Sequence, residues 1–136
     1  MPYVRPQENG NKTDVRWVAV SGASAGLLAV GAPVLEVEAH HNNLEDFETP
    51  GAGFVGRDQT LNRHLSDVVP RPLTWLALDL HQMGVGGDDS WGARTHDAYR
   101  LTAQSYRYSF RLRPFDPRND DPAALARQRF AVPPVQ

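Results

Sequence analysis

The stretch SYRYSFRLR, residues 105–113, has the clearest alternation of apolar and polar residues in the chain. Successive side chains of an extended strand point to opposite faces. One face would therefore carry Tyr106, Tyr108, Phe110 and Leu112, and the other would carry Arg107, Ser109, Arg111 and Arg113. This pattern predicts an antiparallel strand whose apolar face is buried and whose arginine face meets solvent or a partner domain.

Other segments in front of this stretch also predict strands, because they are rich in β-branched and aromatic residues. They are VRWVAV at 15–20, PVLEVEA at 33–39 and LTWLALDL at 73–80, and the first two are separated by a turn marked by Gly22 and Gly26. Trp17 and Trp75 lie in these runs and are expected in the core. Together the runs predict an all-β, antiparallel β-sandwich with long loops and little helix.

Regular patterning is weak in two places. Residues 43–70 contain a glycine-rich loop at 50–56 and, with helical spacing of Leu61, Leu65 and Val68, a short helix. After Phe115 the segments PFDPRNDD and AVPPVQ are rich in proline, with a helical turn at 122–129 between them. We therefore predict a domain over 1–115 and a loosely ordered tail over 116–136.

Composition limits the classes of function. The 136 residues suit one domain, and the net charge of −2 argues against a nucleic-acid partner, which favours a basic surface. The absence of cysteine excludes disulfides and thiolate metal sites. No apolar run approaches the roughly 20 residues that span a bilayer, and the first ten residues lack the apolar centre of a signal peptide. We expect a cytoplasmic protein without a membrane partner, and the chain itself could be a piece of a longer polypeptide.

The segment HQMGVGGDDSW, residues 81–91, holds the residues most suited to a catalytic or binding role. Asp88 and Asp89 are adjacent and would point apart in an extended chain, whereas a catalytic carboxyl pair faces one substrate from about 5–9.5 Å apart. Aspartates after glycines more often accept hydrogen bonds from nearby backbone amides and fix a turn, which is the role expected for both. The GVGG run lacks the lysine of a phosphate-binding loop.

No metal site and no catalytic set is predicted. The five histidines, at positions 40, 41, 64, 81 and 96, do not have the spacing of metal ligands on a helix and are interpreted as surface or loop residues. Trp91 follows the glycines without a strand pattern that would demand its burial. Its indole suits the apolar face of a sugar ring, but from the residues alone it could equally anchor the loop.

Three motifs together resemble one family. HQMGVGGDDSW is similar to the signature near the C-terminus of lac-type β-galactosidases of glycoside hydrolase family two. PYVRPQENGNKTDVRW, residues 2–17, is similar to an upstream motif built around P-x-E-N-G, and YRLTAQSYRYSFRL, residues 99–112, is similar to the closing strands. The resemblance covers residues 2–115 and identifies the chain as the C-terminal half of the last β-domain, a sandwich related to galactose mutarotases.

The resemblance also implies a role. The family cleaves terminal β-galactosides with retention, through two glutamates of a barrel domain that this segment lacks, and binds magnesium and sodium elsewhere, so no cofactor is expected here. Its tryptophan after G-G-D-D-S stacks on the aglycone, which gives Trp91 a substrate-binding role. The supporting loop would comprise Gly84, Gly86, Gly87, Asp88, Asp89 and Ser90.

These implications make the catalytic barrel and a galactoside the expected partners, and the isolated chain is expected to be inactive. Two alternatives stay open. The chain could be a free carbohydrate-binding sandwich that uses Trp91, or an assembly domain whose exposed strand edges self-associate.

Overall fold

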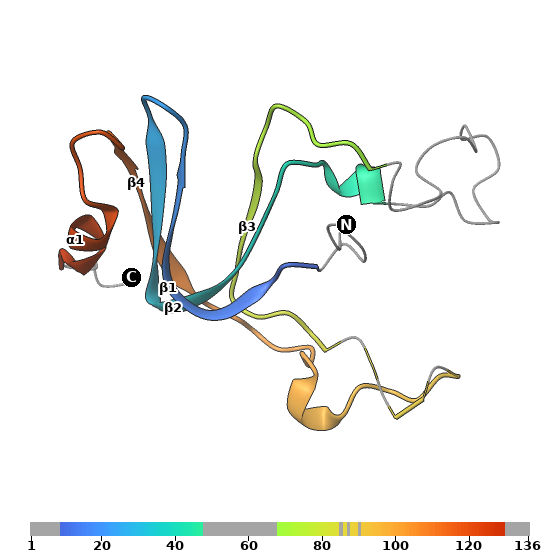
Figure 1. Ribbon diagram of the computed structural model, residues 1–136. Helices are drawn as coiled ribbons and strands as arrows, with labels where there is room; N and C mark the ends of the chain where they lie inside the picture. The colour runs from blue at the N-terminus through green and yellow to red at the C-terminus, as the bar shows by residue number, and fades with distance from the viewer. Residues whose placement is uncertain (1–8, 48–67, 85, 87, 90, 130–136) are drawn as a thin grey trace. The chain divides into compact units, whose positions relative to one another are not determined.

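The computed structural model describes residues 9–47, 68–84, 86, 88, 89 and 91–129 of the chain. The strands β1 (Lys12–Ser21), β2 (Gly26–His40), β3 (Trp75–Asp79) and β4 (Ser109–Phe115) form one sheet (Figure 1). The other elements are two short 3-10 helices, η1 (Leu44–Phe47) and η3 (Asp97–Tyr99), and the helix α1 (Pro122–Arg127). The all-β prediction is confirmed, and one antiparallel sheet with little helix is consistent with the predicted sandwich.

Strand β2 is longer than its sequence suggested. The predicted strand at 33–39 is part of a 15-residue strand that begins at Gly26. Its residues 26–32 pair with β4, and its residues 36–40 pair with β3, both antiparallel. The chain divides into two compact units, one of residues 1–13 and 36–79 and the other of residues 14–35 and 80–136.

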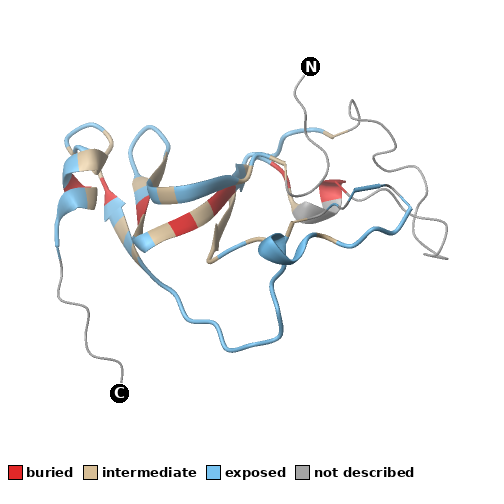
Figure 2. Ribbon diagram, turned by 90° about the horizontal axis from the view of Figure 1, so that it is seen from below, coloured by how far each residue is buried: buried red, intermediate tan, exposed pale blue. Residues whose placement is uncertain are grey.

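The second unit has its core on one face of the strands. Leu28 of β2, Phe115 of β4 and Leu125 of α1 form a buried cluster, against which Ala19, Val30 and Ala126 pack. Figure 2 shows this burial along β2, at the end of β4 and on one side of α1. Gly26 lies opposite Phe115, and a Cβ atom at Gly26 would collide with the phenyl ring, so the close approach of β2 and β4 requires glycine there.

Helix α1 is tied to β4 by arginines. Asp121 caps its N-terminus by accepting from the backbone N–H of Ala123, and Pro122 occupies its first position. At the other end Arg111 donates to the carbonyl oxygens of Leu125 and Gln128, at 3.0 and 2.8 Å. This one guanidinium satisfies carbonyls that the end of a helix leaves without partners.

The prediction for the two faces of residues 105–113 is wrong. The strand begins at Ser109, and Tyr106, Tyr108, Phe110 and Leu112 are between 40% and 51% exposed, whereas Arg111 and Arg113 are half-buried. The reason is α1, which packs on the arginine face. Alternation predicted a two-faced strand, but it could not show which face a segment further along the chain would cover.

Of the tail predicted over residues 116–136, the structure describes residues 116–129. The predicted helical turn is a helix over Pro122–Arg127, held by Leu125 in the cluster and by the arginines of β4. Residues 130–136 lie outside the described part, so the domain boundary at residue 115 stays a prediction.

The first unit pairs the end of β2 with β3 and closes with η1. Phe47 is buried and its ring meets that of His40 edge to face, with centroids 5.2 Å apart. Arg71 makes a two-pronged ion pair with Asp46, and this hydrogen bonding holds the pKa of the Asp46 carboxyl below its usual value. The predicted loop at 50–56 and most of the predicted helix at 61–68 lie outside the described residues. No described helix is long and apolar enough to cross a membrane.

Candidate functional site

The segment between β3 and η3 carries the candidate binding residues. Of the six loop residues predicted to support the site, the structure describes Gly84, Gly86, Asp88 and Asp89, and it describes Trp91 itself. Gly87 and Ser90 lie outside the described residues. From residue 80 to residue 108 the described chain forms no strand, and η3 is its one regular element.

Gly84 fixes the base of the loop. Its backbone N–H donates to the carbonyl oxygen of Tyr99 at 2.9 Å, and its own carbonyl oxygen accepts from the Thr95 hydroxyl at 2.7 Å. A Cβ atom at Gly84 would lie 2.9 Å from Cγ2 of Thr95 and 3.0 Å from Cβ of Tyr99. Only glycine allows the two halves of the loop to approach so closely.

Asp89 makes the turn that precedes the tryptophan. Its Oδ1 accepts from the backbone N–H of Trp91 at 2.8 Å and from that of Ala93 at 3.2 Å. These hydrogen bonds, the one from Trp91 first, lower the pKa of the Asp89 carboxyl below its usual value. Gly92 follows with a φ of +120°, a conformation that L-residues rarely adopt. The interpretation of Asp89 as a turn-maker agrees with this geometry.

Asp88 has a different partner. Its Oδ1 lies 2.8 Å from Nε2 of His96, and both side chains are largely exposed. The two neighbouring aspartates therefore serve separate contacts and do not face a common point. A catalytic pair of a glycosidase requires two carboxyl groups that face one bond of the substrate. The geometry of this segment does not provide that pair.

The Trp91 indole projects into solvent. The residue is 94% exposed, the largest exposure among the large hydrophobic residues of the described chain. An aromatic side chain that anchors a loop is packed against its neighbours, and this one is not. Its backbone is nevertheless held by the Asp89 turn. The arrangement presents a large flat apolar surface from a fixed backbone position.

The histidines are dispersed over separate hydrogen bonds. His40 contacts the Glu38 carboxylate and the carbonyl oxygen of Asn9, His41 contacts the carbonyl oxygen of Leu73, and His96 contacts Asp88. His64 is not described. Within the described ranges no three histidine or acidic side chains gather in a way that could hold a metal ion.

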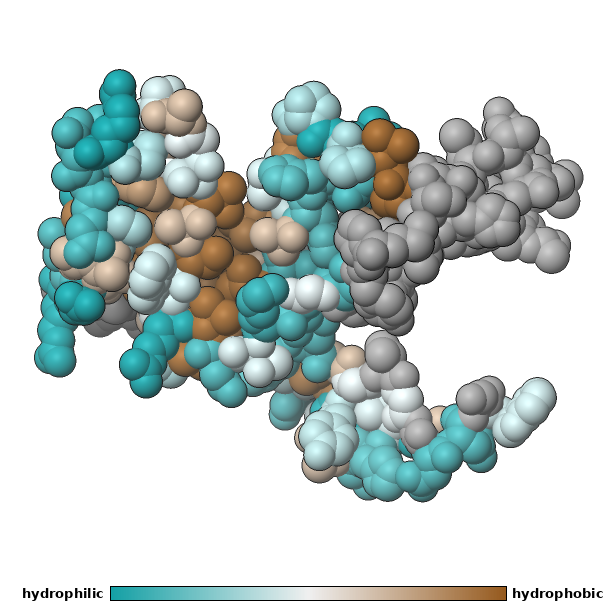
Figure 3. Space-filling model, in the orientation of Figure 1, coloured by the Kyte–Doolittle hydropathy of each residue, from teal (hydrophilic) through white to brown (hydrophobic). Residues whose placement is uncertain are grey.

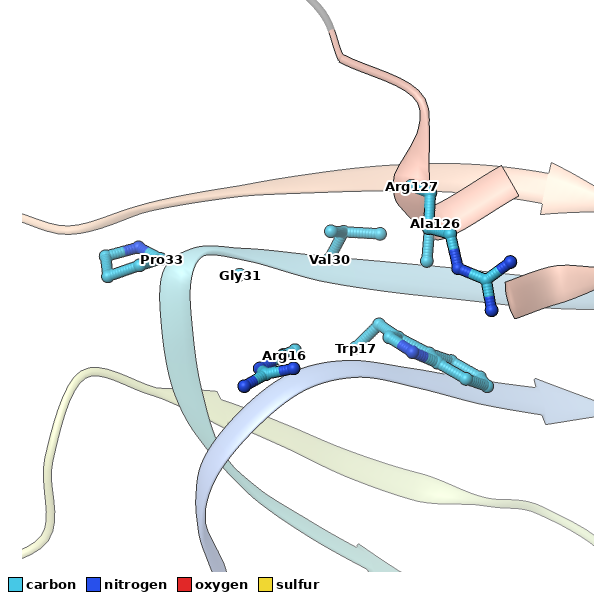
Figure 4. A pocket seen from close by; sticks show the side chains of 7 residues that line it. All are labelled: Arg16, Trp17, Val30, Gly31, Pro33, Ala126 and Arg127. Carbon is cyan, nitrogen blue, oxygen red and sulfur yellow. The ribbon is translucent and has the colours of Figure 1, made fainter. Parts of the chain in front are cut away.

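Sequence reasoning missed a cavity in the second unit. Trp17, expected in the core, is 39% exposed and lines a cavity of about 390 Å³ (Figure 4). The lining residues come from β1, β2 and α1 and are Arg16, Trp17, Val30, Gly31, Pro33, Ala126 and Arg127. We refer to it as the Trp17 cavity. No local pattern could have revealed it, because α1 lies about a hundred residues after β1 in the chain.

Comparison with known proteins places the chain in a family. Residues 1–112 match the family described as the beta galactosidase small chain. A β-galactosidase of Priestia megaterium is 40% identical over 115 residues, which are 83% of this chain and 10% of that protein. A β-galactosidase of Streptococcus thermophilus is 35% identical over 118 residues, which are 85% of this chain and 10% of that protein.

A more distant relative, a β-galactosidase of Vibrio vulnificus, is 28% identical over 113 residues, or 83% of this chain and 9% of that protein. The chain thus spans about a tenth of the length of the curated relatives that it matches. The range matched by the family includes β1, β2, β3 and the loop that carries Trp91. The chain belongs to the β-galactosidase small-chain family.

Proposed function

We propose that the chain is a non-catalytic part of a retaining β-galactosidase that hydrolyses terminal β-D-galactosides such as lactose. In this proposal Trp91 forms an aromatic wall of the aglycone subsite, and the catalytic carboxyl groups belong to another domain. The observation that carries the proposal is the almost fully exposed indole on a loop with a fixed base. Membership of the family supplies the class of enzyme.

The exposed indole supports a contact with a sugar. An indole offers one of the largest flat apolar surfaces of any side chain, and the C–H face of a pyranose is also flat and apolar. In the isolated chain this surface meets water, which is unfavourable, and covering it would be favourable. The Asp89 turn keeps the backbone of Trp91 in place beforehand, so that less conformational entropy is lost on binding.

The state of the aspartates supports a catalytic site elsewhere. A general acid that protonates a leaving group near neutral pH needs a raised pKa, which burial usually provides. Asp89 has the opposite environment, since two backbone N–H groups stabilise its charged form and lower its pKa. Asp88 is exposed and contacts His96. Neither aspartate suits the acid role.

An uncovered face of the second unit supports a partner domain. Residues Leu27, Phe110 and Leu112 share the face of the strands opposite to α1, and each is 38–51% exposed. Figure 3 shows hydrophobic residues at the surface over the strands beside α1. In a β-sandwich the apolar face of one sheet packs against a second sheet. In the proposed enzyme another part of the parent polypeptide covers this face.

A chimeric enzyme tests the role of Trp91. Residues 1–115 of this chain would replace the matching segment of the Priestia megaterium β-galactosidase, with and without Trp91→Ala. We expect the substitution to lower kcat/KM for lactose by about twofold to tenfold, since a stacking contact contributes about 0.5–1.5 kcal/mol. For β-galactosyl fluoride, whose leaving group has no ring, kcat/KM should be nearly unchanged. Equal losses of kcat/KM for both substrates would contradict the proposed role of Trp91 in the aglycone subsite.

The matched control in the chimera is Trp17→Phe, which changes a tryptophan outside the loop. It should leave kcat/KM unchanged for both lactose and β-galactosyl fluoride. The isolated 136-residue chain should not hydrolyse an aryl β-galactoside. Its Trp91→Ala variant, prepared in the same way, gives the background rate of hydrolysis, and the two rates should be equal. Turnover above that background would contradict the assignment of catalysis to another domain.

Titration separates this proposal from a free carbohydrate-binding module. A module would bind lactose tightly through Trp91, whereas one aromatic wall without convergent polar groups gives millimolar affinity or none. Indole fluorescence of the isolated chain and of its Trp91→Ala variant would distinguish the two. Sedimentation at two concentrations would show whether a second copy covers the apolar face of Leu27, Phe110 and Leu112 in the absence of the parent domains.

A further inference from the structure

We propose that the Trp17 cavity binds a small molecule made of one ring and one carboxylate, at a site separate from the Trp91 loop. Its volume of about 390 Å³ falls at the lower end of the roughly 300–1,000 Å³ typical of ligand sites. The cavity combines an aromatic wall with two cationic side chains, Arg16 and Arg127. The inference does not rest on the proposed role of Trp91.

The two guanidinium groups are the first argument. Among the described residues neither Arg16 nor Arg127 has a hydrogen-bond or ion-pair partner. By contrast Arg71 is paired with Asp46, and Arg111 donates to the carbonyl oxygens at the end of α1. A planar guanidinium matches a carboxylate through two parallel hydrogen bonds. Both residues are exposed to solvent, and the presence of two cationic side chains at one cavity favours an anionic ligand.

The apolar part of the lining is the second argument. Trp17 supplies an indole, and Val30, Pro33 and Ala126 add apolar atoms from β2 and α1. Figure 4 shows the indole of Trp17 between Arg16 and Arg127 along the cavity. A ring that lies on the indole would bury apolar surface, while its carboxylate reaches a guanidinium. A compact, highly hydrated anion without a ring would gain nothing from this wall.

The C-terminal segment completes the site. Ala126 and Arg127 lie beyond residue 112, where the match with the family ends. They are placed by Leu125, which is buried in the core, and by the hydrogen bonds from Arg111 to the end of α1. The cavity therefore joins a family segment, β1 and β2, to a segment outside the match. Its ligand need not be one that other members of the family bind.

Two-dimensional ¹H–¹⁵N spectra of the 136-residue chain test the proposal. The indole N–H signals of the three tryptophans would be assigned with Trp75→Phe and Trp91→Phe variants. Sodium benzoate and sodium glucuronate serve as the aromatic and the saccharide probe, and benzamide and glucose as their uncharged counterparts. We expect one of the two carboxylates to shift the Trp17 signal in a saturable way below about 10 mM, with no shift from its uncharged counterpart.

Substitution of the cations gives the second readout. Arg127→Gln and Arg16→Gln should each weaken binding of that carboxylate about tenfold or more, as expected for a lost charged hydrogen bond. Arg129→Gln removes the same charge from the same segment without touching the cavity, and should leave affinity unchanged. Unchanged thermal unfolding of all three variants would show that they are folded. Trp17→Phe should retain weaker binding, followed through the backbone N–H signals of β1, because a smaller aromatic wall remains.

Three results would overturn the proposal. The first is the absence of a saturable shift at Trp17 with either carboxylate. The second is an equal shift with the uncharged counterpart, and the third is an equal loss of affinity in Arg129→Gln and Arg127→Gln. A response to benzoate alone would assign an aromatic carboxylate, and a response to glucuronate alone would assign a sugar acid.

Discussion

The second unit contains two regions that are held together in different ways. The sheet region is formed by β1, residues 26–35 of β2, β4 and α1, and side chains from β2, β4 and α1 meet there in one buried cluster. In the loop region, residues 80–108, the described residues are almost all partly or fully exposed, and a few hydrogen bonds fix the backbone. Burial stabilises the first region, whereas the second offers its groups to a ligand. Substitutions should therefore separate stability from binding.

The largest effect is expected in the sheet region. Leu28 is fully buried, so Leu28→Ala should lower the free energy of unfolding by about 2–5 kcal/mol, through lost apolar burial and the cavity left behind. Leu112 of β4 is 51% exposed, and Leu112→Ala is the matched control with a much smaller loss. Chemical denaturation of both variants measures the difference. Equal losses would mean that the face opposite α1 is as well covered as the core.

The next effect is expected at the base of the loop. Gly84→Ala places a methyl group against Thr95 and Tyr99, and the strain should cost about 1–3 kcal/mol of local stability. Gly86 has open space around it, so Gly86→Ala should cost little. Hydrogen exchange of the Gly84 backbone N–H, which donates to Tyr99, reports on the base directly. Similar exchange in the two variants would refute the close approach at Gly84.

Acid should affect the loop through Asp89. Its pKa is lowered in the folded chain, because the backbone N–H groups of Trp91 and Ala93 stabilise the carboxylate. The turn is therefore fully stabilised above about pH 4, the ordinary range of an aspartate, and loses this support as the pH falls through the lowered folded pKa. Exchange of the Trp91 backbone N–H should quicken relative to that of Leu28 as acid is added. Asp89→Asn should remove most of this pH dependence.

The smallest effect on stability is expected at Trp91. Because the residue is 94% exposed, Trp91→Ala should change the free energy of unfolding by less than about 0.5 kcal/mol. Thermal unfolding of the isolated chain measures this. A large loss of unfolding free energy would mean that the indole anchors the loop. The loop region would then also depend on side-chain packing for its stability.

The strands and the Asp89 turn could be predicted from local sequence. Alternation and β-branched residues at 15–20 and 73–80 correspond to β1 and β3, since a strand's pattern repeats every two residues. Asp89 after a run of glycines predicted a side chain that caps backbone N–H groups, and it accepts from two of them. The motifs of residues 2–17 and 81–91 were sufficient to indicate the family that the comparison found.

Only the tertiary structure decided which faces are covered. The apolar face of residues 106–112 was expected inside, but α1 covers the arginine face instead, because Leu125 docks beside Leu28 and Arg111 meets the end of the helix. The same docking brings Arg127 to Trp17 and forms a cavity from segments about a hundred residues apart. A local pattern records whether a strand has two different faces. The choice of the face that is buried depends on what the rest of the chain brings to it.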